Sequence, residues 1–131
     1  MSANHSSMRT PLKNVRRLGS AKEGADHFWK LRVTAVANLF LTLFLVWLVV
    51  SLVGADHAAV KARLAHPVNA IGLGLLAVSG AIHMRLGMQV IIEDYVRSEG
   101  KKVLLVVLNT FFAIVVGAAC CFAVLKLSFG A

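Results

Sequence analysis

Cysteine is scarce in this sequence, and its two cysteines, Cys120 and Cys121, are adjacent. Adjacent cysteines cannot form an ordinary structural disulfide with each other, and no further cysteine provides the spacing of a metal site. Both lie within a long apolar run near the C-terminus. We therefore expect them to be small side chains that face lipid or a neighbouring helix.

Charged residues are also few, at 15% of 131 residues, whereas hydrophobic residues make up 58%. A chain this short and apolar excludes several soluble domains and predicts a single small membrane domain. Acidic residues are rarer than basic ones, with 6 Asp and Glu against 14 Lys and Arg. The basic residues lie in blocks that flank apolar runs, as in membrane proteins, so no nucleic-acid binding is expected.

The N-terminal segment, residues 1–32, lacks the apolar core and small-residue cleavage site of a removable signal peptide. We expect it to remain attached as a basic cytoplasmic segment. Phe28 and Trp29 are typical of the headgroup level, and Asp26 is a candidate N-cap for a helix that follows. Seven basic residues lie here: Arg9, Lys13, Arg16, Arg17, Lys22, Lys30 and Arg32.

Three apolar runs, over about residues 33–53, 68–95 and 103–127, are long enough to cross a bilayer core of about 30 Å. The sequence thus predicts an all-α integral membrane protein with a three-helix anchor domain over 33–127. The connection between the first two runs has room for a short interfacial helix, and Pro67 suits the first turn of the second span. The distribution of basic residues favours a cytoplasmic N-terminus and a periplasmic C-terminus.

The first span contains a polar stripe, in which Thr34, Asn38 and Thr42 recur every four residues. Such residues in a membrane helix bond to a neighbouring helix or back to their own backbone. This interpretation is favoured over direct contact with a ligand.

The second span is the most polar of the three, and it holds His83 and Arg85 within the membrane. An ionisable side chain in hydrocarbon is costly and therefore indicates a function. A flat, bulky group could lie on the face around His83, because small residues lie above and below it, and imidazole is a good axial ligand for heme iron. The alternative is a histidine hydrogen-bonded to a neighbouring helix. This face comprises Gly72, Leu76, Ser79, Gly80, His83, Gly87 and Val90.

A heme with two histidine ligands would need its second ligand from another chain. The remaining histidines all lie outside the apolar cores: His5, His27, His57 and His66. Arg85 projects roughly opposite His83, and the sequence leaves open whether it meets a carboxylate, a propionate or a lipid phosphate.

Tyr95 lies about 18 Å beyond His83 along the same helix, at the cytoplasmic boundary. Its phenol could donate a hydrogen bond to a quinone carbonyl, and Asp94 could orient it or handle protons. The alternative is a tyrosine of the interfacial aromatic belt, followed by solvated charges.

Two motifs resemble a known family. The second span carries His83-x-x-x-Gly87-Met88-x-x-x-x-x-Asp94-Tyr95, and the region before the first span carries Gly24-x-Asp26-x-Phe28-x-x-x-Arg32-x-Thr34-Ala35. Together with the three spans, these motifs resemble the hydrophobic membrane anchor of succinate dehydrogenase, particularly its alphaproteobacterial members. The resemblance covers about residues 9–127.

The resemblance implies that the three helices pack with a partner anchor subunit, with heme b between the two subunits. It implies that His83 is one axial ligand of the heme and that Tyr95 and Asp94 bind ubiquinone. Arg32 matches a basic residue near the heme propionates and the quinone pocket, a role that suits a guanidinium group. Arg85 is not part of the pattern.

The function implied is that of a membrane anchor in succinate dehydrogenase, respiratory complex II of the tricarboxylic acid cycle, in the bacterial inner membrane. The partners would be a cytochrome b556 anchor subunit, an iron-sulfur subunit and a flavoprotein subunit, with flavin and iron-sulfur clusters confined to those partners. The nearest alternative is the anchor of a quinol:fumarate reductase. A small oligomeric transporter that uses His83 and Arg85 as a relay is a more distant one.

Overall fold

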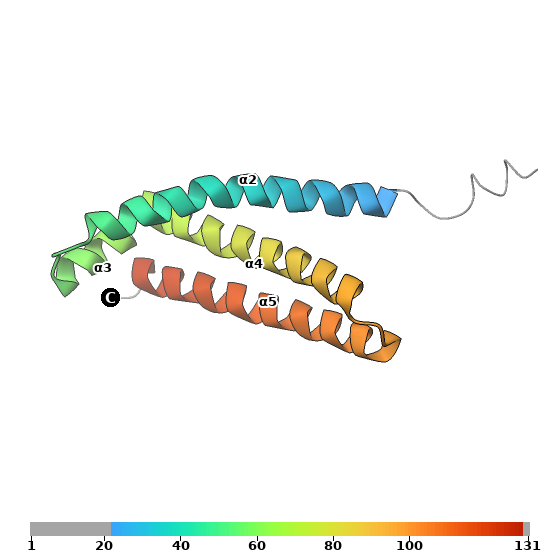
Figure 1. The fold of residues 1–131 in the computed structure, drawn as a ribbon. Coiled ribbons are helices and arrows are strands. Elements are labelled where there is room, and N and C mark those ends of the chain that lie inside the picture. Colours follow the sequence, from blue (N-terminus) through green and yellow to red (C-terminus); the bar gives the residue numbers. More distant parts are fainter. Residues whose placement is uncertain (1–21, 130–131) are drawn as a thin grey trace, which may run out of the picture.

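The computed structural model describes residues 22–129, and these residues form helices joined by short connections (Figure 1). The helices are α2 (Lys22–Ser51), α3 (His57–Ala65), α4 (Pro67–Tyr95) and α5 (Glu99–Phe129). α2, α4 and α5 are long and apolar enough to cross a membrane. The prediction of three spans is therefore confirmed, as is the short helix in the first connection.

α2 begins at Lys22, eleven residues before the predicted first span. Asp26 lies inside this helix, where its Oδ2 is 3.9 Å from Lys30 Nζ, so its assignment as an N-cap is wrong. Lys, Glu and Ala are good helix formers, and pairs of opposite charge four residues apart support a helix in water or among headgroups. Hydropathy thus marks where α2 enters the bilayer and not where the helix begins.

α5 also begins earlier than predicted, at Glu99 rather than residue 103. Lys102 Nζ lies 3.2 Å from Glu99 Oε1 within this first turn. The connection between α4 and α5 is accordingly reduced to residues 96–98. A connection this short makes α4 and α5 antiparallel neighbours.

α4 lies between α2 and α5 (Figure 1), and within the described residues α2 and α5 do not contact each other. Two glycines mark where the helices approach closely. A Cβ added to Gly72 of α4 would lie 2.6 Å from the Phe44 ring of α2, and one added to Gly117 of α5 would lie 3.1 Å from Ala81 Cβ of α4. Both outer helices are therefore positioned against α4.

The short helix α3 packs against α4 and α5 at one end of the bundle. Asp56 caps its start, because Oδ1 accepts a hydrogen bond from the Ala59 backbone N–H at 3.0 Å. Its end is tied to α4 by buried Asn69, whose Nδ2 donates to the Arg63 carbonyl at 2.7 Å. Pro67 occupies the first turn of α4 as expected.

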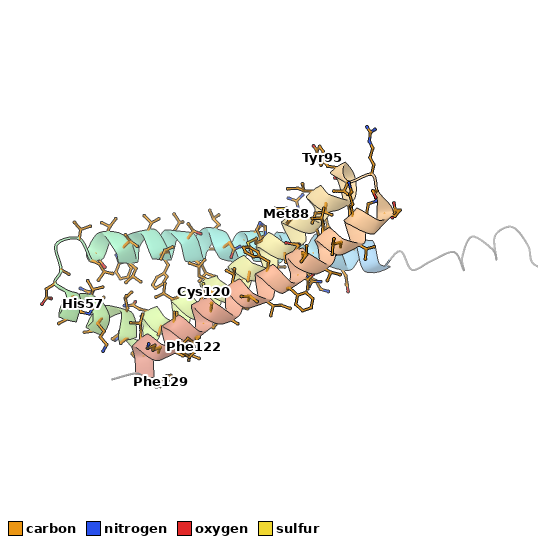
Figure 2. All side chains as sticks on the ribbon, turned by 90° about the horizontal axis from the view of Figure 1, so that it is seen from below. His57, Met88, Tyr95, Cys120, Phe122 and Phe129 are labelled. Atoms are coloured by element: carbon orange, nitrogen blue, oxygen red, sulfur yellow. The ribbon has the colours of Figure 1, made fainter. Side chains whose placement is uncertain are left out.

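The described chain has a small core of its own, since only four apolar side chains are buried: Leu48, Leu86, Ile92 and Ala113. Most of the other large apolar side chains are exposed, where lipid or helices of other subunits can cover them. Figure 2 shows α2 crossing the α4–α5 pair obliquely. Tyr95 lies at one end of the bundle, and His57 and Phe129 lie at the other.

Candidate functional site

His83 lies on the face of α4 that meets α2, and its side chain is partly buried. Its Nδ1 is 3.0 Å from Thr34 Oγ1 of α2. The imidazole is therefore hydrogen-bonded to a neighbouring helix, which is the structural alternative left open by the sequence. This contact occupies one ring nitrogen only, and within residues 22–129 Nε2 has no hydrogen-bond partner.

The surface of α4 beside His83 is open. A Cβ added to Gly80 or to Gly87, one turn before and one turn after the histidine, would meet nothing within 4 Å. Gly72 differs, because the Phe44 ring already fills the space beside it. One free imidazole nitrogen flanked by small residues fits a planar group bound through a metal, such as heme.

The polar stripe predicted on α2 continues along this interface. Asn38 lies one turn from Thr34, and its Oδ1 is buried without a hydrogen-bond partner in the described chain. The same holds for Ser79 Oγ, which lies one turn from His83 on α4. Because α2 and α4 are antiparallel, these two residues share the layer next to the Thr34–His83 pair. The α2–α4 interface is thus polar in two successive layers.

Arg85 faces α5 instead of α2, in agreement with its predicted position opposite His83. Its Nε donates to Thr110 Oγ1 at 3.2 Å, and its backbone carbonyl accepts a hydrogen bond from Asn109 Nδ2 at 2.9 Å. These two bonds join α4 to α5. The observed partner is a threonine hydroxyl, whereas the sequence suggested an anionic group.

Arg32 lies on α2 two residues before Thr34 and is exposed. Its guanidinium carbon is 5.0 Å from the centre of the Phe28 ring, a cation–π distance. The Thr34–His83 contact shows that these two residues lie at the same height along the bundle axis. Arg32 precedes Thr34 by two residues, so its backbone is only about 3 Å from the height of His83. Tyr95 lies about 15 Å further along the bundle.

Tyr95 is the last residue of α4, and its side chain is 81% exposed. Asp94 beside it is exposed as well. Figure 2 shows Tyr95 at the end of the bundle, beside the turn into α5. No hydrogen bond or ion pair within the described part of the chain joins Tyr95 or Asp94 to Arg32. Arg32 therefore does not form a closed pocket with Tyr95 and Asp94 within residues 22–129.

A cavity of about 650 Å³ lies at the opposite end of the bundle, between α4 and α5. It is lined almost entirely by apolar side chains, including Pro67, Leu75 and Phe129, with Cys121 at its wall. Both cysteines are free. The cavity contains none of the predicted site residues and offers few hydrogen-bond donors, so it does not qualify as the quinone site.

The pairing of Thr34 with His83 was not predicted from the sequence. The four-residue repeat of Thr34, Asn38 and Thr42 indicated that α2 had a polar face, but not which helix that face meets. Likewise, Asn109 and Thr110 interrupt the third apolar run, and the sequence does not indicate which helix they meet. The missing information was the rotation of each helix about its own axis.

Comparison with known proteins finds similar transmembrane subunits. Residues 6–117 match the sequence model of the family described as Succinate dehydrogenase/Fumarate reductase transmembrane subunit. The succinate dehydrogenase hydrophobic membrane anchor subunit of Paracoccus denitrificans is 30% identical over 122 residues, which are 93% of this chain and 94% of that protein.

Two Rickettsia proteins with the same description are similar to the chain over most of its length. The Rickettsia bellii protein is 29% identical over 81% of this chain and 85% of its own length. The Rickettsia felis protein is 31% identical over 76% of this chain and 83% of its own. No solved structure matches the chain.

Proposed function

Because this chain belongs to the family of succinate dehydrogenase and fumarate reductase transmembrane subunits, we propose that it anchors a succinate dehydrogenase in the membrane and contributes to a heme b site and a ubiquinone site. The anchoring role follows from the family and from the three spanning helices. The two sites rest on single side chains of α4. The heme site is supported above all by the imidazole of His83, which has a hydrogen-bond partner at Nδ1 but none at Nε2 within the described residues.

His83 would provide one axial ligand to the heme through Nε2. Its Nδ1 is already bonded to Thr34, and the open surface at Gly80 and Gly87 leaves room for a flat ring system. Heme b, when bound, supplies a one-electron carrier near the quinone. The second axial ligand would come from the companion cytochrome b556 subunit, because the described residues contain no second histidine at this depth.

Arg32 would pair with a heme propionate. Along the bundle axis, its backbone lies about 3 Å from the level of His83 but about 15 Å from that of Tyr95. Of its two expected roles, contact with a heme propionate therefore fits its position better than contact with the quinone. The guanidinium group already lies over the Phe28 ring, and this contact restricts the rotamers of Arg32 before it binds a propionate. A carboxylate is the partner for which this planar cation is best suited.

Tyr95 and Asp94 would form part of the ubiquinone site. The phenol would donate a hydrogen bond to a quinone carbonyl, and the carboxylate would orient the phenol or take up a proton. Their exposure agrees with a site that becomes a pocket only when other subunits cover it. The iron-sulfur and companion anchor subunits would supply that cover.

The orientation that we propose rests on the distribution of basic residues. Arg97, Lys101 and Lys102 lie at the same end of the bundle as the start of α2 (Figure 1), and the first eleven residues of α2 include Lys22, Lys30 and Arg32. The opposite end carries Lys61, Arg63 and Lys126. This excess of basic residues supports an orientation in which the N-terminus and Tyr95 lie on the cytoplasmic side and the C-terminus on the periplasmic side. The flavoprotein and iron-sulfur subunits, which hold the flavin and the clusters, would dock on the cytoplasmic end.

The anchor of a quinol:fumarate reductase remains a second candidate, because the family description names both enzymes. The two differ in the direction of electron flow, and the three similar proteins are all described as succinate dehydrogenase subunits. Succinate oxidation is therefore the favoured direction.

The heme assignment is tested by the reduced-minus-oxidised absorption spectrum of the purified complex. We expect a b-type signal in the unmodified complex and its loss in His83→Ala, because the described residues contain no second histidine at this level. His57→Ala is the matched control, since His57 is exposed in α3 at the far end. A complex without a b-type signal, or a signal unaffected by His83→Ala, would contradict the assignment.

A further inference from the structure

The hydroxyl of Thr34 has three neighbours and only one proton to donate. Its Oγ1 lies 2.8 Å from the Lys30 carbonyl oxygen, 3.1 Å from the Leu31 carbonyl oxygen and 3.0 Å from His83 Nδ1. A carbonyl oxygen can only accept, so the contacts to α2 direct the hydroxyl proton toward the backbone. The lone pairs of Oγ1 then remain for His83.

His83 must consequently donate through Nδ1–H. A neutral imidazole carries one proton, so a proton on Nδ1 leaves the lone pair on Nε2. The opposite tautomer would take the hydroxyl proton away from both carbonyls. It would also place an N–H on Nε2, where the described chain offers no acceptor in the membrane interior. Both effects favour the Nδ1–H form.

From this geometry we propose that Thr34 is a positioning residue for the heme ligand, because it selects the tautomer of His83 and fixes the direction of its ring. The proposal rests on the heme role of His83 put forward above. Thr34 does not touch the heme itself. It anchors Nδ1, so that Nε2 keeps the lone pair with which His83 would hold the iron.

The bond also has an electronic consequence. Hydrogen bonding at the second nitrogen of a ligating histidine raises the basicity of the ligand, and loss of such a partner typically costs about 10–100-fold in metal affinity. A more basic imidazole stabilises ferric over ferrous iron. Removing the Thr34 hydroxyl should therefore weaken heme retention and raise the midpoint potential of the heme.

The test compares four variants of the complete complex. Thr34→Val keeps the side-chain shape and removes the hydroxyl, whereas Thr34→Ser keeps the hydroxyl and removes the methyl group. Thr34→Ala removes both and serves if the valine variant does not assemble. Thr42→Val is the matched control, because Thr42 belongs to the same stripe of α2 but lies two turns away and is exposed.

Three readouts separate positioning from general packing: heme content, midpoint potential, and the low-spin ferric EPR signal, whose largest g value responds to the orientation of the axial imidazole. We expect Thr34→Val and Thr34→Ala to lose heme about 10–100-fold more readily. Both should also show a raised potential and an altered EPR signal. Thr34→Ser and Thr42→Val should stay close to the unmodified complex.

The proposal is overturned if the valine and alanine variants keep the potential and EPR signal of the unmodified complex. It is equally overturned if Thr34→Ser shifts as far as Thr34→Ala, since the hydroxyl would then be irrelevant. A failure of the heme assignment looks different, because the unmodified complex would itself lack the b-type spectrum.

Discussion

The close contact between Gly72 and Phe44 provides a quantitative test of the α2–α4 packing. An alanine at position 72 would place its Cβ 2.6 Å from Phe44 Cε1, 2.9 Å from Cζ and 3.2 Å from Cδ1. The ring would have to move by about 1 Å to restore ordinary contacts. The ring of Trp47 is its neighbour on α2, with the two ring centres 6.1 Å apart. Overpacking of this kind costs about 1–3 kcal/mol.

A gain in helix propensity opposes this cost, because alanine is about 0.8–1.0 kcal/mol more favourable than glycine inside a helix. Gly72→Ala should therefore lower the free energy of unfolding by about 0–2 kcal/mol. Gly74→Ala is the matched control on the same helix, since its added Cβ would meet nothing within 4 Å. It should receive the propensity gain alone, so the two variants should differ by about 1–3 kcal/mol.

The assay is unfolding of the purified complex in mixed micelles with increasing SDS, followed by heme absorbance. Gly72→Ala should unfold at a lower SDS fraction than Gly74→Ala. Phe44→Leu removes the ring atoms that clash, so a double-mutant cycle with Gly72→Ala should show a favourable interaction between the two changes. Equal stabilities for the two alanine variants would refute the contact as the determinant of helix spacing.

Two further predictions concern the ends of the bundle. Tyr95→Phe should retain heme but raise the KM for ubiquinone about two- to tenfold, which corresponds to the loss of one hydrogen bond. Succinate oxidation with a soluble artificial acceptor is the control. Unchanged quinone kinetics would argue against the assigned role. Asn69→Ala removes the 2.7 Å hydrogen bond to the Arg63 carbonyl, which should lower the free energy of local unfolding at α3 by about 1 kcal/mol. Proteolysis around α3 should then be about fivefold faster. Asn109→Ala, which removes a similar bond between α4 and α5, should leave that cleavage unchanged.

The sequence motifs identified the family, which the match over residues 6–117 bears out. Its site residues, His83, Tyr95, Asp94 and Arg32, remain predictions, because each proposed site would be completed by residues of other subunits. His83 illustrates the difficulty: ligation and a hydrogen bond to a neighbouring helix were treated as alternatives. The observed bond to Thr34 uses only one nitrogen, so the two roles are compatible.

Helix boundaries were predicted less well than helix number. The first ten residues of α2 include Lys22, Asp26 and Lys30, which carry no hydropathy signal, although their helix propensity is adequate. The same reason explains the early start of α5 at Glu99. Transfer into lipid decides where an apolar run must be, whereas backbone hydrogen bonding decides how far the helix extends beyond it.

The sequence by itself determined the three spans, the room for a short helix before Pro67 and the placement of His83 and Arg85 on opposite sides of one helix. These are local properties, because they depend on the transfer of each residue to lipid and on the 100° step of the helix. Only the tertiary structure decided that His83 meets Thr34, 49 residues away, and that Arg85 meets Thr110. Such pairs depend on the rotation and level of one helix against another, which are fixed by close contacts such as Gly72 on Phe44.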